Sequence, residues 1–375
     1  MKEKNSQIPI PVIFAINNTY VKQLATVLVS ILKNSNSKNI YKFYVLNSDI
    51  TNKNLEILTD IVKKHNKKSE INFIDMNNIL KDFNLEDYMS RRENYTYISI
   101  ETYFRFFIPE LFPQYNKVIY LDADILVMQD LKNLFDINIK NAYAGVVQDN
   151  WQILSYNHKE HKPAGNMYKD FKEYYQKKLK KTNSKYFNAG VLLLNLDEIR
   201  KDNIVQKLWD FTANESPLEF QDQDVLNAVL EPKLKYIDNK WNVLKDLAWL
   251  ITQYSCDKIT KQNYKKTLKK TAIFHYVGSN KPWVIHNSDY EYIKDWWKYY
   301  KQTPYFQYRE LSILKNINYL SKAFVYKSYF TLRVLNFTIL DIYQQDAKLK
   351  FKIFEKLKIS IKFIVPKRYT NIESI

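Results

Sequence analysis

Glycine is scarce in this sequence, whose 375 residues contain only Gly145, Gly165, Gly190 and Gly278. No two of these glycines stand close enough to form the G-x-G-x-x-G or Walker A loops that cradle phosphates in many nucleotide-binding proteins. A nucleotide ligand would therefore have to be held by other groups.

Cysteine, long apolar runs and acidic residues are also in short supply. The single cysteine, Cys256, excludes an intrachain disulfide and suits a reducing cytoplasm. No run of about 18 apolar residues is free of charge, so we expect no transmembrane helix. Lys and Arg number 57 against 40 Asp and Glu, which gives a net charge of +17. This excess favours polyanionic partners such as nucleic acid, anionic membrane or phosphorylated substrates.

Apolar strands and amphipathic helices alternate in the first part of the chain. We expect strands at residues 10–17, 41–48 and 71–76, separated by helices at 19–35 and 51–66. This order predicts a βαβαβ unit with a parallel sheet, in which ligands lie beyond the carboxyl ends of the strands. The predicted fold class is therefore α/β.

Two carboxylates interrupt the apolar segment NKVIYLDADILVMQDL at residues 116–131, where Asp122 and Asp124 stand between apolar neighbours. Burying an unpaired ionised carboxylate is costly, so these acids need a cation or hydrogen bonds. Alternation would place both on one side of a strand, about 7 Å apart. That arrangement suits a hard divalent cation shared with a diphosphate. The alternative is that lysines or helix N-termini satisfy both acids.

The segment YLDADILV resembles the D-x-D segment of family 8 glycosyltransferases, which are retaining, nucleotide-sugar-dependent enzymes related to bacterial lipopolysaccharide galactosyltransferases and glucosyltransferases. Further segments resemble the same family in the same order: IFAINNTY, ETYFRFFIPELF, YFNAGVLLLNL with FQDQDVLN, and FHYVGSNKPW. Together they span about residues 10–283. The resemblance implies a GT-A fold, a Rossmann-like α/β architecture with a mixed, mainly parallel sheet flanked by helices.

The resemblance also implies a metal site in which Asp122, Asp124 and His275 bind Mn²⁺ or Mg²⁺. A neutral imidazole beside carboxylates suits Mn²⁺ better than Mg²⁺. The metal would bridge the diphosphate of the donor and so replace the glycine-rich cradle.

Further residues are implied to bind the UDP-sugar donor. Those implied for the base, ribose, diphosphate and sugar are Ala15, Asn17, Thr19, Arg105, Ala123, Asp149, Asn188, Asp222, Gln223, Gly278 and Lys281, together with the two D-x-D acids. Bacterial members often carry Asp and Asn at the positions of Asn17 and Thr19, so base recognition is expected to differ in detail.

Two residues are implied to be catalytic, Gln223 and Asp222. Gln223 would lie nearest the anomeric carbon, opposite the leaving group. Its amide is a poor nucleophile, and Asp222 would point the other way in an extended segment. We therefore expect a front-face displacement in which a phosphate oxygen of UDP accepts the proton of the acceptor, rather than a double displacement.

The expected domains are a GT-A domain at residues 1–303, with a surface insertion at 150–185, and a basic, aromatic, mostly helical segment at 304–375. The predicted reaction moves galactose or glucose from a UDP-sugar to a glycan or glycolipid acceptor in lipopolysaccharide or surface-glycan synthesis. We expect a cytoplasmic enzyme whose C-terminal segment contacts the anionic inner face of the bacterial plasma membrane.

One alternative function uses the paired aspartates differently. A nucleic-acid-binding protein or nucleotidyltransferase would also explain the net charge of +17 and a divalent metal at Asp122 and Asp124. No helix-turn-helix, RNP or KH signature is present, so nucleic acid is not expected as a partner.

Overall fold

The computed structural model of the protein describes residues 9–81, 100–157, 163, 168–245, 258–278, 281–283, 292–306, 327–334, 337–345, 348–353 and 363–364. The chain divides into two compact units, Met1–Ser279 with Lys298–Pro304 and Asn280–Trp297 with Tyr305–Ile375. Each unit contains β-structure of its own. The expected domain boundary after residue 303 stays a prediction.

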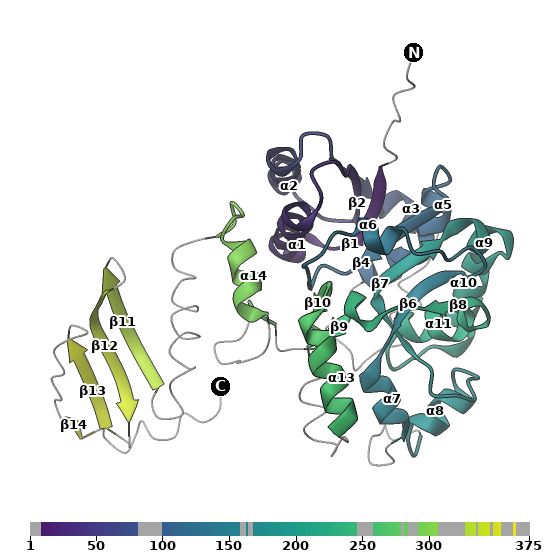
Figure 1. Cartoon of the computed structure of the whole chain (residues 1–375). Helices are drawn as coiled ribbons and strands as arrows, with labels where there is room; N and C mark the ends of the chain where they lie inside the picture. The colour runs from purple at the N-terminus through teal and green to yellow at the C-terminus, as the bar shows by residue number, and fades with distance from the viewer. Residues whose placement is uncertain are drawn as a thin grey trace. The chain divides into compact units, whose positions relative to one another are not determined.

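A seven-stranded sheet with the order β3-β2-β1-β4-β7-β6-β8 forms the centre of the first unit (Figure 1). Its strands are β1 (Ile10–Ala15), β2 (Tyr41–Asn47), β3 (Glu70–Asp75), β4 (Lys117–Leu121), β6 (Ala144–Gln148), β7 (Phe187–Asn195) and β8 (Leu234–Tyr236). The first four run parallel, β7 is antiparallel to both β4 and β6, and β6 and β8 are parallel. The expected mixed, mainly parallel sheet is confirmed.

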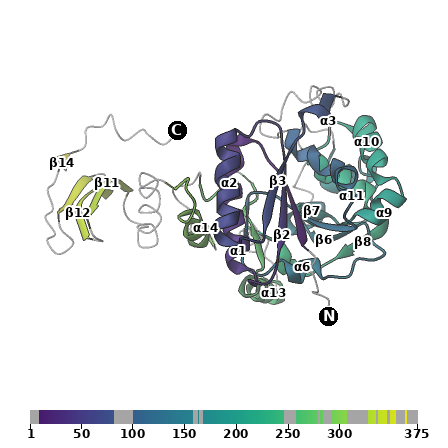
Figure 2. The ribbon, with the colours of Figure 1, turned by 90° about the horizontal axis from the view of Figure 1, so that it is seen from above.

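Helices α1 (Val21–Asn34) and α2 (Asn52–His65) connect the first three strands and lie side by side on one face of the sheet (Figure 2). In α1 the buried Leu24, Val27, Leu28 and Ile31 recur at helical spacing. This local periodicity explains why the βαβαβ unit was predictable from the sequence.

The opposite face of the sheet is covered by α9 (Leu196–Lys201), α10 (Ile204–Glu215) and α11 (Asp222–Val229) (Figure 2). Trp209 of α10 packs against Tyr103, Phe106 and Phe107. These aromatic residues belong to η2 (Ile100–Phe107), a 3₁₀-helix that continues into α5 (Ile108–Leu111). The remaining elements of the described chain before the C-terminal sheet are η1 (Asn18–Tyr20), α3 (Asn77–Lys81), α6 (Lys132–Phe135), α7 (Asn150–Asn157), α8 (Phe171–Lys177), η4 (Glu231–Lys233), η5 (Asn239–Trp241), α13 (Lys258–Lys269) and α14 (Ile293–Tyr300).

A second, three-stranded sheet adjoins the carboxyl end of β4. It consists of β5 (Ile125–Val127), β10 (Ile273–His275) and β9 (Val243–Leu244), in that order. The central strand β10 is antiparallel to β5 and parallel to β9. Only three residues separate β4 from β5, so the chain passes directly from the main sheet into the small one.

Residues 150–185 differ from the expected surface insertion. In the described part, Phe171, Tyr174 and Tyr175 of α8 are buried in the hydrophobic core, and the Lys181 side chain is only 1% exposed. Lys181 Nζ reaches Glu231 Oε2 at 2.9 Å. The many lysines made this stretch look solvated, whereas its aromatic residues supply buried apolar area.

The second unit contains a four-stranded antiparallel sheet formed by β11 (Lys327–Val334), β12 (Phe337–Gln345), β13 (Lys348–Ile353) and β14 (Phe363–Ile364). The expectation of a mostly helical C-terminal segment is therefore wrong for the described residues. The sequence KLKFKI of β13 alternates lysine with apolar residues, and this period of two is typical of a strand. Cys256 lies outside the described residues.

Candidate functional site

Asp122 and Asp124 lie in the turn between β4 and β5, and not on one continuous strand as expected. The chain changes sheets at this point, so the two acids stand at the carboxyl end of β4. The Asp122 backbone N–H donates to the Gly190 carbonyl (2.8 Å), and the Tyr276 N–H donates to the Asp124 carbonyl (2.9 Å). These two bonds fix the turn against β7 and against the segment after β10.

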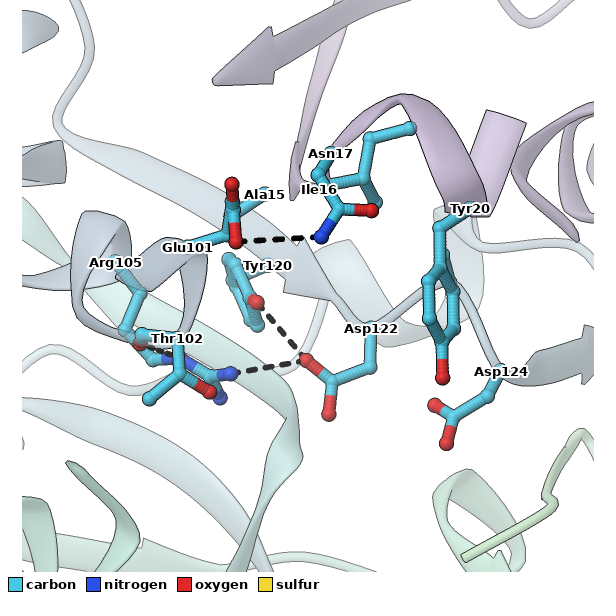
Figure 3. A pocket seen from close by; sticks show the side chains of 11 residues that line it. Ala15, Ile16, Asn17, Tyr20, Glu101, Thr102, Arg105, Tyr120, Asp122 and Asp124 are labelled. Carbon is cyan, nitrogen blue, oxygen red and sulfur yellow. Dashed lines mark hydrogen bonds and ion pairs between the residues drawn. The ribbon is translucent and has the colours of Figure 1, made fainter. Parts of the chain in front are cut away.

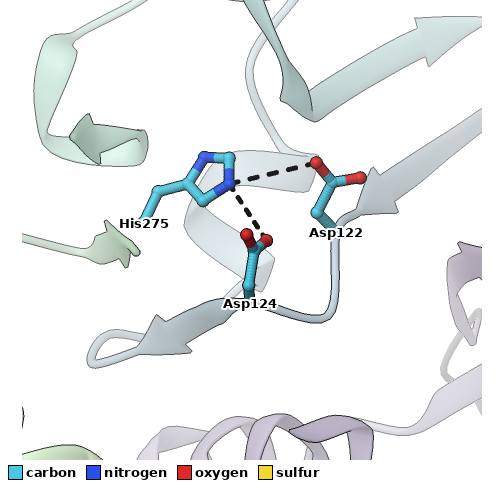
Figure 4. Close-up of side chains that lie close together, drawn as sticks. All are labelled: Asp122, Asp124 and His275. Carbon is cyan, nitrogen blue, oxygen red and sulfur yellow. Dashed lines mark hydrogen bonds and ion pairs between the residues drawn. The ribbon is translucent and has the colours of Figure 1, made fainter. Parts of the chain in front are cut away.

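His275, the last residue of β10, completes a compact cluster with the two acids. Its Nε2 lies 3.1 Å from Asp124 Oδ1 and 3.9 Å from Asp122 Oδ2 (Figure 4). One possible ligand atom from each residue lies within 4.8 Å of the others. His275 pairs with Ile125 in the small sheet, which explains how a residue so distant in sequence reaches the turn.

The donor set of this cluster fits a divalent cation. The side chains of Asp122 and Asp124 are 27% and 15% exposed, whereas that of His275 is 3% exposed. The carboxylates thus remain reachable from solvent while the imidazole is rigidly buried. Two carboxylate oxygens with one imidazole nitrogen suit Mn²⁺ better than Mg²⁺, because Mg²⁺ prefers oxygen ligands alone.

Arg105 connects one acid of this cluster to Asp222. Its Nη2 donates to Asp122 Oδ1 (3.1 Å), its Nη1 donates to the Ala189 carbonyl (2.6 Å), and its guanidinium lies over the Tyr120 ring (4.4 Å to the centroid). Burial alone would lower the pKa of Arg105, but neighbouring acidic groups, Asp222 foremost, raise the pKa instead. Arg105 therefore remains a buried cation.

Asp222 begins α11 and carries a carboxylate oxygen with unused hydrogen-bonding capacity. Arg105 Nε lies 3.1 Å from Asp222 Oδ2, but the Nε–H group donates to the Thr102 carbonyl (3.0 Å) instead. Among the described residues, Asp222 Oδ2 consequently has no hydrogen-bond donor, although it is buried. Burial raises the pKa of Asp222 to about 6 although Arg105 opposes the shift.

A cavity of about 210 Å³ lies beside the cluster of Asp122, Asp124 and His275, which is called the metal-type cluster below (Figure 3). It is formed at the carboxyl ends of β1 and β4 and by η2, where a parallel sheet of this kind is expected to bind ligands. Its lining residues are Ala15, Ile16, Asn17, Tyr20, Glu101, Thr102, Arg105, Tyr120, Asp122, Ala123 and Asp124. Six of the residues singled out in the sequence thus line one cavity.

Asn17 is the N-cap residue of η1, and its side chain forms hydrogen bonds with residues beside it. Its Oδ1 accepts hydrogen bonds from the backbone N–H (3.1 Å) and the hydroxyl (2.5 Å) of Thr19. Its Nδ2 donates to Glu101 Oε2 (3.5 Å). Thr19 is not among the residues that line the cavity, but it donates both of these hydrogen bonds to Asn17, which is.

A second polar cluster gathers Asp149, Asn188 and Gln223. Asn188 Nδ2 donates to Gln223 Oε1 (3.2 Å) and to Asp149 Oδ2 (3.4 Å). Gln223 Oε1 also accepts from the Ala189 N–H (2.9 Å). Asp149 caps the start of α7, and burial raises its pKa. Asp222 and Gln223 are adjacent in α11, yet their side chains contact different neighbours.

The last two residues that the resemblance implies for the site are Gly278 and Lys281. Gly278 is exposed and adopts a left-handed backbone with φ of 75°, which favours glycine. Lys281 belongs to the second unit. The roles expected for both residues toward the pyrophosphate stay predictions.

Sequence reasoning missed Glu101, Tyr120 and Asn242, all of which contact residues of the site. Tyr120 donates its hydroxyl to Asp122 Oδ1 (2.9 Å), and Asn242 contacts both His275 (3.0 Å) and Asn188 (2.8 Å). Tyr120 stands two positions before Asp122, so strand alternation could have indicated it. Nothing local indicates Asn242, because its contacts depend on how β9 pairs with β10.

Comparison with known proteins identifies the family. Residues 11–286 match glycosyl transferase family 8. The chain belongs to this family. It is therefore a glycosyltransferase, which uses a nucleotide-sugar donor and an acceptor, and the nucleotidyltransferase alternative is set aside. Members of the family typically use a divalent metal, for which the Asp122, Asp124 and His275 cluster is a candidate site in the described chain.

Several relatives resemble the chain over much of its length. A Haemophilus influenzae protein assigned as a glycosyltransferase is 29% identical over 72% of this chain and 72% of its own. The lipopolysaccharide 1,3-galactosyltransferase of Salmonella typhimurium is 30% identical over 51% of this chain and 50% of its own. The galactosyltransferase LgtC, solved with donor and acceptor sugar analogues, superposes with a TM-score of 0.62 at 21% identity, covering 81% of this chain and 100% of its own. This superposition confirms the GT-A-like fold. None of the helices within the described residues has the length and apolarity needed to cross a bilayer.

Proposed function

We propose that this glycosyltransferase moves galactose or glucose from a UDP-hexose to a glycan or glycolipid acceptor, in the synthesis of lipopolysaccharide or a similar surface glycan at the cytoplasmic face of the membrane. One observation carries the proposal. The cluster of Asp122, Asp124 and His275 adjoins a cavity of about 210 Å³ at the carboxyl ends of β1 and β4. A diphosphate bound to the cluster would place its nucleoside in that cavity.

The cation is held by Asp122, Asp124 and His275 in this proposal. When bound, it supplies charge stabilisation for the departing diphosphate. Arg105 and Tyr120 both donate to Asp122 Oδ1, which leaves Asp122 Oδ2 directed toward His275. The two donors therefore orient one carboxylate so that a single oxygen serves as the ligand.

The nucleoside would lie against Ala15, Asn17 and Tyr20, with Glu101 beside them. Glu101 is buried and accepts only neutral donors, Asn17 Nδ2 (3.5 Å) and Ser48 Oγ (3.2 Å), among the described residues. A carboxylate in this position can accept further hydrogen bonds from ribose hydroxyls or from the uracil N–H. Glu101 would thus supply an acidic group near the nucleoside, whereas bacterial members often carry an aspartate at the position of Asn17.

The sugar would be recognised by Asp149, Asn188, Gln223 and Asp222. Asp222 Oδ2 is a buried acceptor whose hydrogen bond is unmet within the described chain, so a hexose hydroxyl is a suitable partner. The three other residues form a network whose amide and carboxylate groups can exchange a mutual bond for one to the sugar. This set offers both donors and acceptors to a hexose.

The reaction is proposed to be a front-face displacement with retention. The acceptor oxygen forms a bond to the anomeric carbon as the bond to UDP breaks, and the proton of the acceptor passes to a phosphate oxygen of the leaving UDP. Asp222 forms an ion pair with Arg105, and the amide oxygen of Gln223 is a weak nucleophile that already accepts from the Ala189 N–H, so neither side chain is assigned as the nucleophile in this proposal. Trapping a covalent sugar adduct on Asp222 of the wild-type enzyme would contradict this mechanism.

The C-terminal sheet is proposed to contact anionic lipid. Lys348, Lys350 and Lys352 occupy alternate positions of β13, so the backbone places them on one face of the strand. Each lysine near an anionic surface contributes about 1 kcal/mol. Replacing all three with Gln should reduce partitioning onto phosphatidylserine vesicles at least about tenfold, whereas replacing Lys265, Lys266 and Lys269 of α13 should change it little. Equal partitioning of both triple variants removes the role of the sheet.

The main proposal is tested by measuring UDP release from a panel of UDP-sugars with Mn²⁺, with Mg²⁺ and with a chelator. We expect turnover of UDP-galactose or UDP-glucose that requires the metal and is faster with Mn²⁺. Asp124→Ala should abolish both turnover and metal-dependent UDP binding while leaving the fold intact. The proposal fails if no UDP-sugar is turned over and UDP binding does not depend on metal.

A further inference from the structure

Asn242 is a buried amide between the metal-type cluster and the polar cluster of Asp149, Asn188 and Gln223. The latter is called the sugar cluster below. It stands directly before β9 and is 3% exposed. Its Oδ1 lies 3.0 Å from His275 Nδ1, and its Nδ2 donates to Asn188 Oδ1 at 2.8 Å. Both ends of one side chain are therefore committed to residues of the site.

The orientation of these amides follows from one backbone group. The Gly190 N–H can only donate, and it donates to Asn188 across 3.0 Å, so the atom facing it must be Asn188 Oδ1. The Asn242 atom that faces the same oxygen must then be the donor, Nδ2. The remaining atom of Asn242, Oδ1, faces His275 and can only accept.

This orientation determines which nitrogen of His275 carries the proton. Because Asn242 Oδ1 is an acceptor, Nδ1 must be protonated to donate to it. In the neutral ring Nε2 then presents a lone pair toward Asp124 Oδ1 and Asp122 Oδ2. Three electron-rich atoms that face one another repel unless a positive charge lies between them, and a metal ion bound at Nε2 would supply that charge.

The same network reaches the sugar cluster. Asn188 uses its oxygen for Asn242 and Gly190 and its nitrogen for Gln223 and Asp149. A change in the Asn242 amide therefore alters the group that holds Gln223. The path from His275 to Gln223 contains only two intervening side chains.

We propose that Asn242 is a positioning residue that fixes His275 as an Nε2 ligand and, through Asn188, orients the amide groups facing the sugar. This inference rests on the proposed metal site. It assigns two separable tasks to Asn242, accepting from His275 and donating to Asn188.

Two substitutions separate these tasks. Asn242→Leu removes both groups at similar size and should weaken Mn²⁺ binding about 10- to 100-fold, measured by the electron paramagnetic resonance of free Mn²⁺ with and without UDP. Asn242→Asp keeps the acceptor for His275 but cannot donate to Asn188. We expect its Mn²⁺ affinity to stay within about threefold of wild type while its rate of sugar transfer falls.

A matched control lies in β7, at the end opposite to Asn188. Asn195 is also a buried asparagine, and its Nδ2 donates to the carbonyls of Ile139 and Lys140. Asn195→Leu should lower the thermal stability without changing Mn²⁺ affinity. If it weakened Mn²⁺ binding as much as Asn242→Leu, loss of stability would explain both results and the inference would be overturned.

The tautomer provides a test that needs no variant. Nitrogen-15 spectra of the metal-free wild-type protein should show His275 protonated at Nδ1, and a bare Nδ1 with protonated Nε2 would overturn the inference. Folded Asn242→Leu with wild-type Mn²⁺ affinity, or Asn242→Asp as impaired as Asn242→Leu, would overturn it too. Wild-type protein that binds no Mn²⁺ would instead show that the proposed metal site itself is wrong.

Discussion

Gly190→Ala is the substitution that tests the geometry of the metal-type cluster most directly. A Cβ atom at this position would lie 2.3 Å from His275 Cε1 and 2.7 Å from Asp122 Oδ2. Carbon atoms normally approach to about 3.5 Å, so the imidazole would have to retreat by about 1.2 Å. Gly190 has no left-handed backbone, so the resistance to alanine comes from steric contact, and the three nearest atoms belong to these two side chains.

The expected loss is large because two candidate metal ligands must move at once. A misplacement of about 1 Å costs on the order of 10²-fold in a site that depends on geometry. This factor corresponds to about 2.7 kcal/mol. We expect Mn²⁺ affinity and sugar transfer to fall by about this factor, measured by titration of Mn²⁺ and by UDP release.

Gly145→Ala is the matched control in the neighbouring strand β6. Its Cβ would meet Ile139 Cγ2 at 3.2 Å and no other side chain closer than 3.4 Å. It should leave Mn²⁺ affinity unchanged and cost no more than about 1 to 3 kcal/mol of stability through overpacking. The reasoning is refuted if folded Gly190→Ala binds Mn²⁺ as tightly as the wild type does.

Three further predictions follow from other contacts. Arg105→Gln should lower the free energy of unfolding, measured with urea, by about 3 kcal/mol because Asp222 is left as an unpaired buried charge. Adding Asp222→Asn should recover part of that loss. If the effects of the two substitutions were simply additive, the pairing of Arg105 with Asp222 would be contradicted. Burial raises the pKa of Asp224 to about 6 from 3.8, so the folded state holds an extra proton between these values and loses stability as pH rises through them. The stability advantage of wild type over Asp224→Asn should therefore shrink by up to about 3 kcal/mol between pH 4 and 7, and parallel profiles would count against it. Glu101→Gln should weaken UDP binding about tenfold in calorimetry by removing a charged acceptor, and unchanged affinity would exclude Glu101 from nucleoside recognition.

The βαβαβ unit was predictable because its signals are local. The expected strand at residues 41–48 is one residue longer than β2 at its C-terminal end. The expected helix at residues 51–66 is one residue longer than α2 at both ends. Apolar periodicity within a helix and continuity within a buried strand depend only on neighbours in the sequence. The grouping of Asp122, Asp124 and His275 in the candidate site was obtained differently, through resemblance to a family.

The remaining features could not be predicted because they depend on tertiary pairing. Asp122 and Asp124 were placed on one strand, since an apolar run does not show where the chain leaves one sheet for another. The C-terminal segment contains both a period of two, as in KLKFKI of β13, and some helical spacing, so its sequence alone does not decide between strand and helix. Asn242 escaped notice because its partners, His275 and Asn188, are distant in sequence.

The candidate metal ligands Asp124 and His275 are far apart in the sequence, and this separation affects how the protein is assembled. Asp124 and His275 are 151 residues apart, so their meeting closes a long loop and must overcome its entropy. A cation shared by these residues is then a removable cross-link between the turn after β4 and strand β10. A bound ion would stabilise the closed arrangement by an amount that rises with the logarithm of its free concentration once that concentration exceeds the dissociation constant. The concentration of available divalent metal would accordingly influence the stability of the small sheet as well as the rate of catalysis.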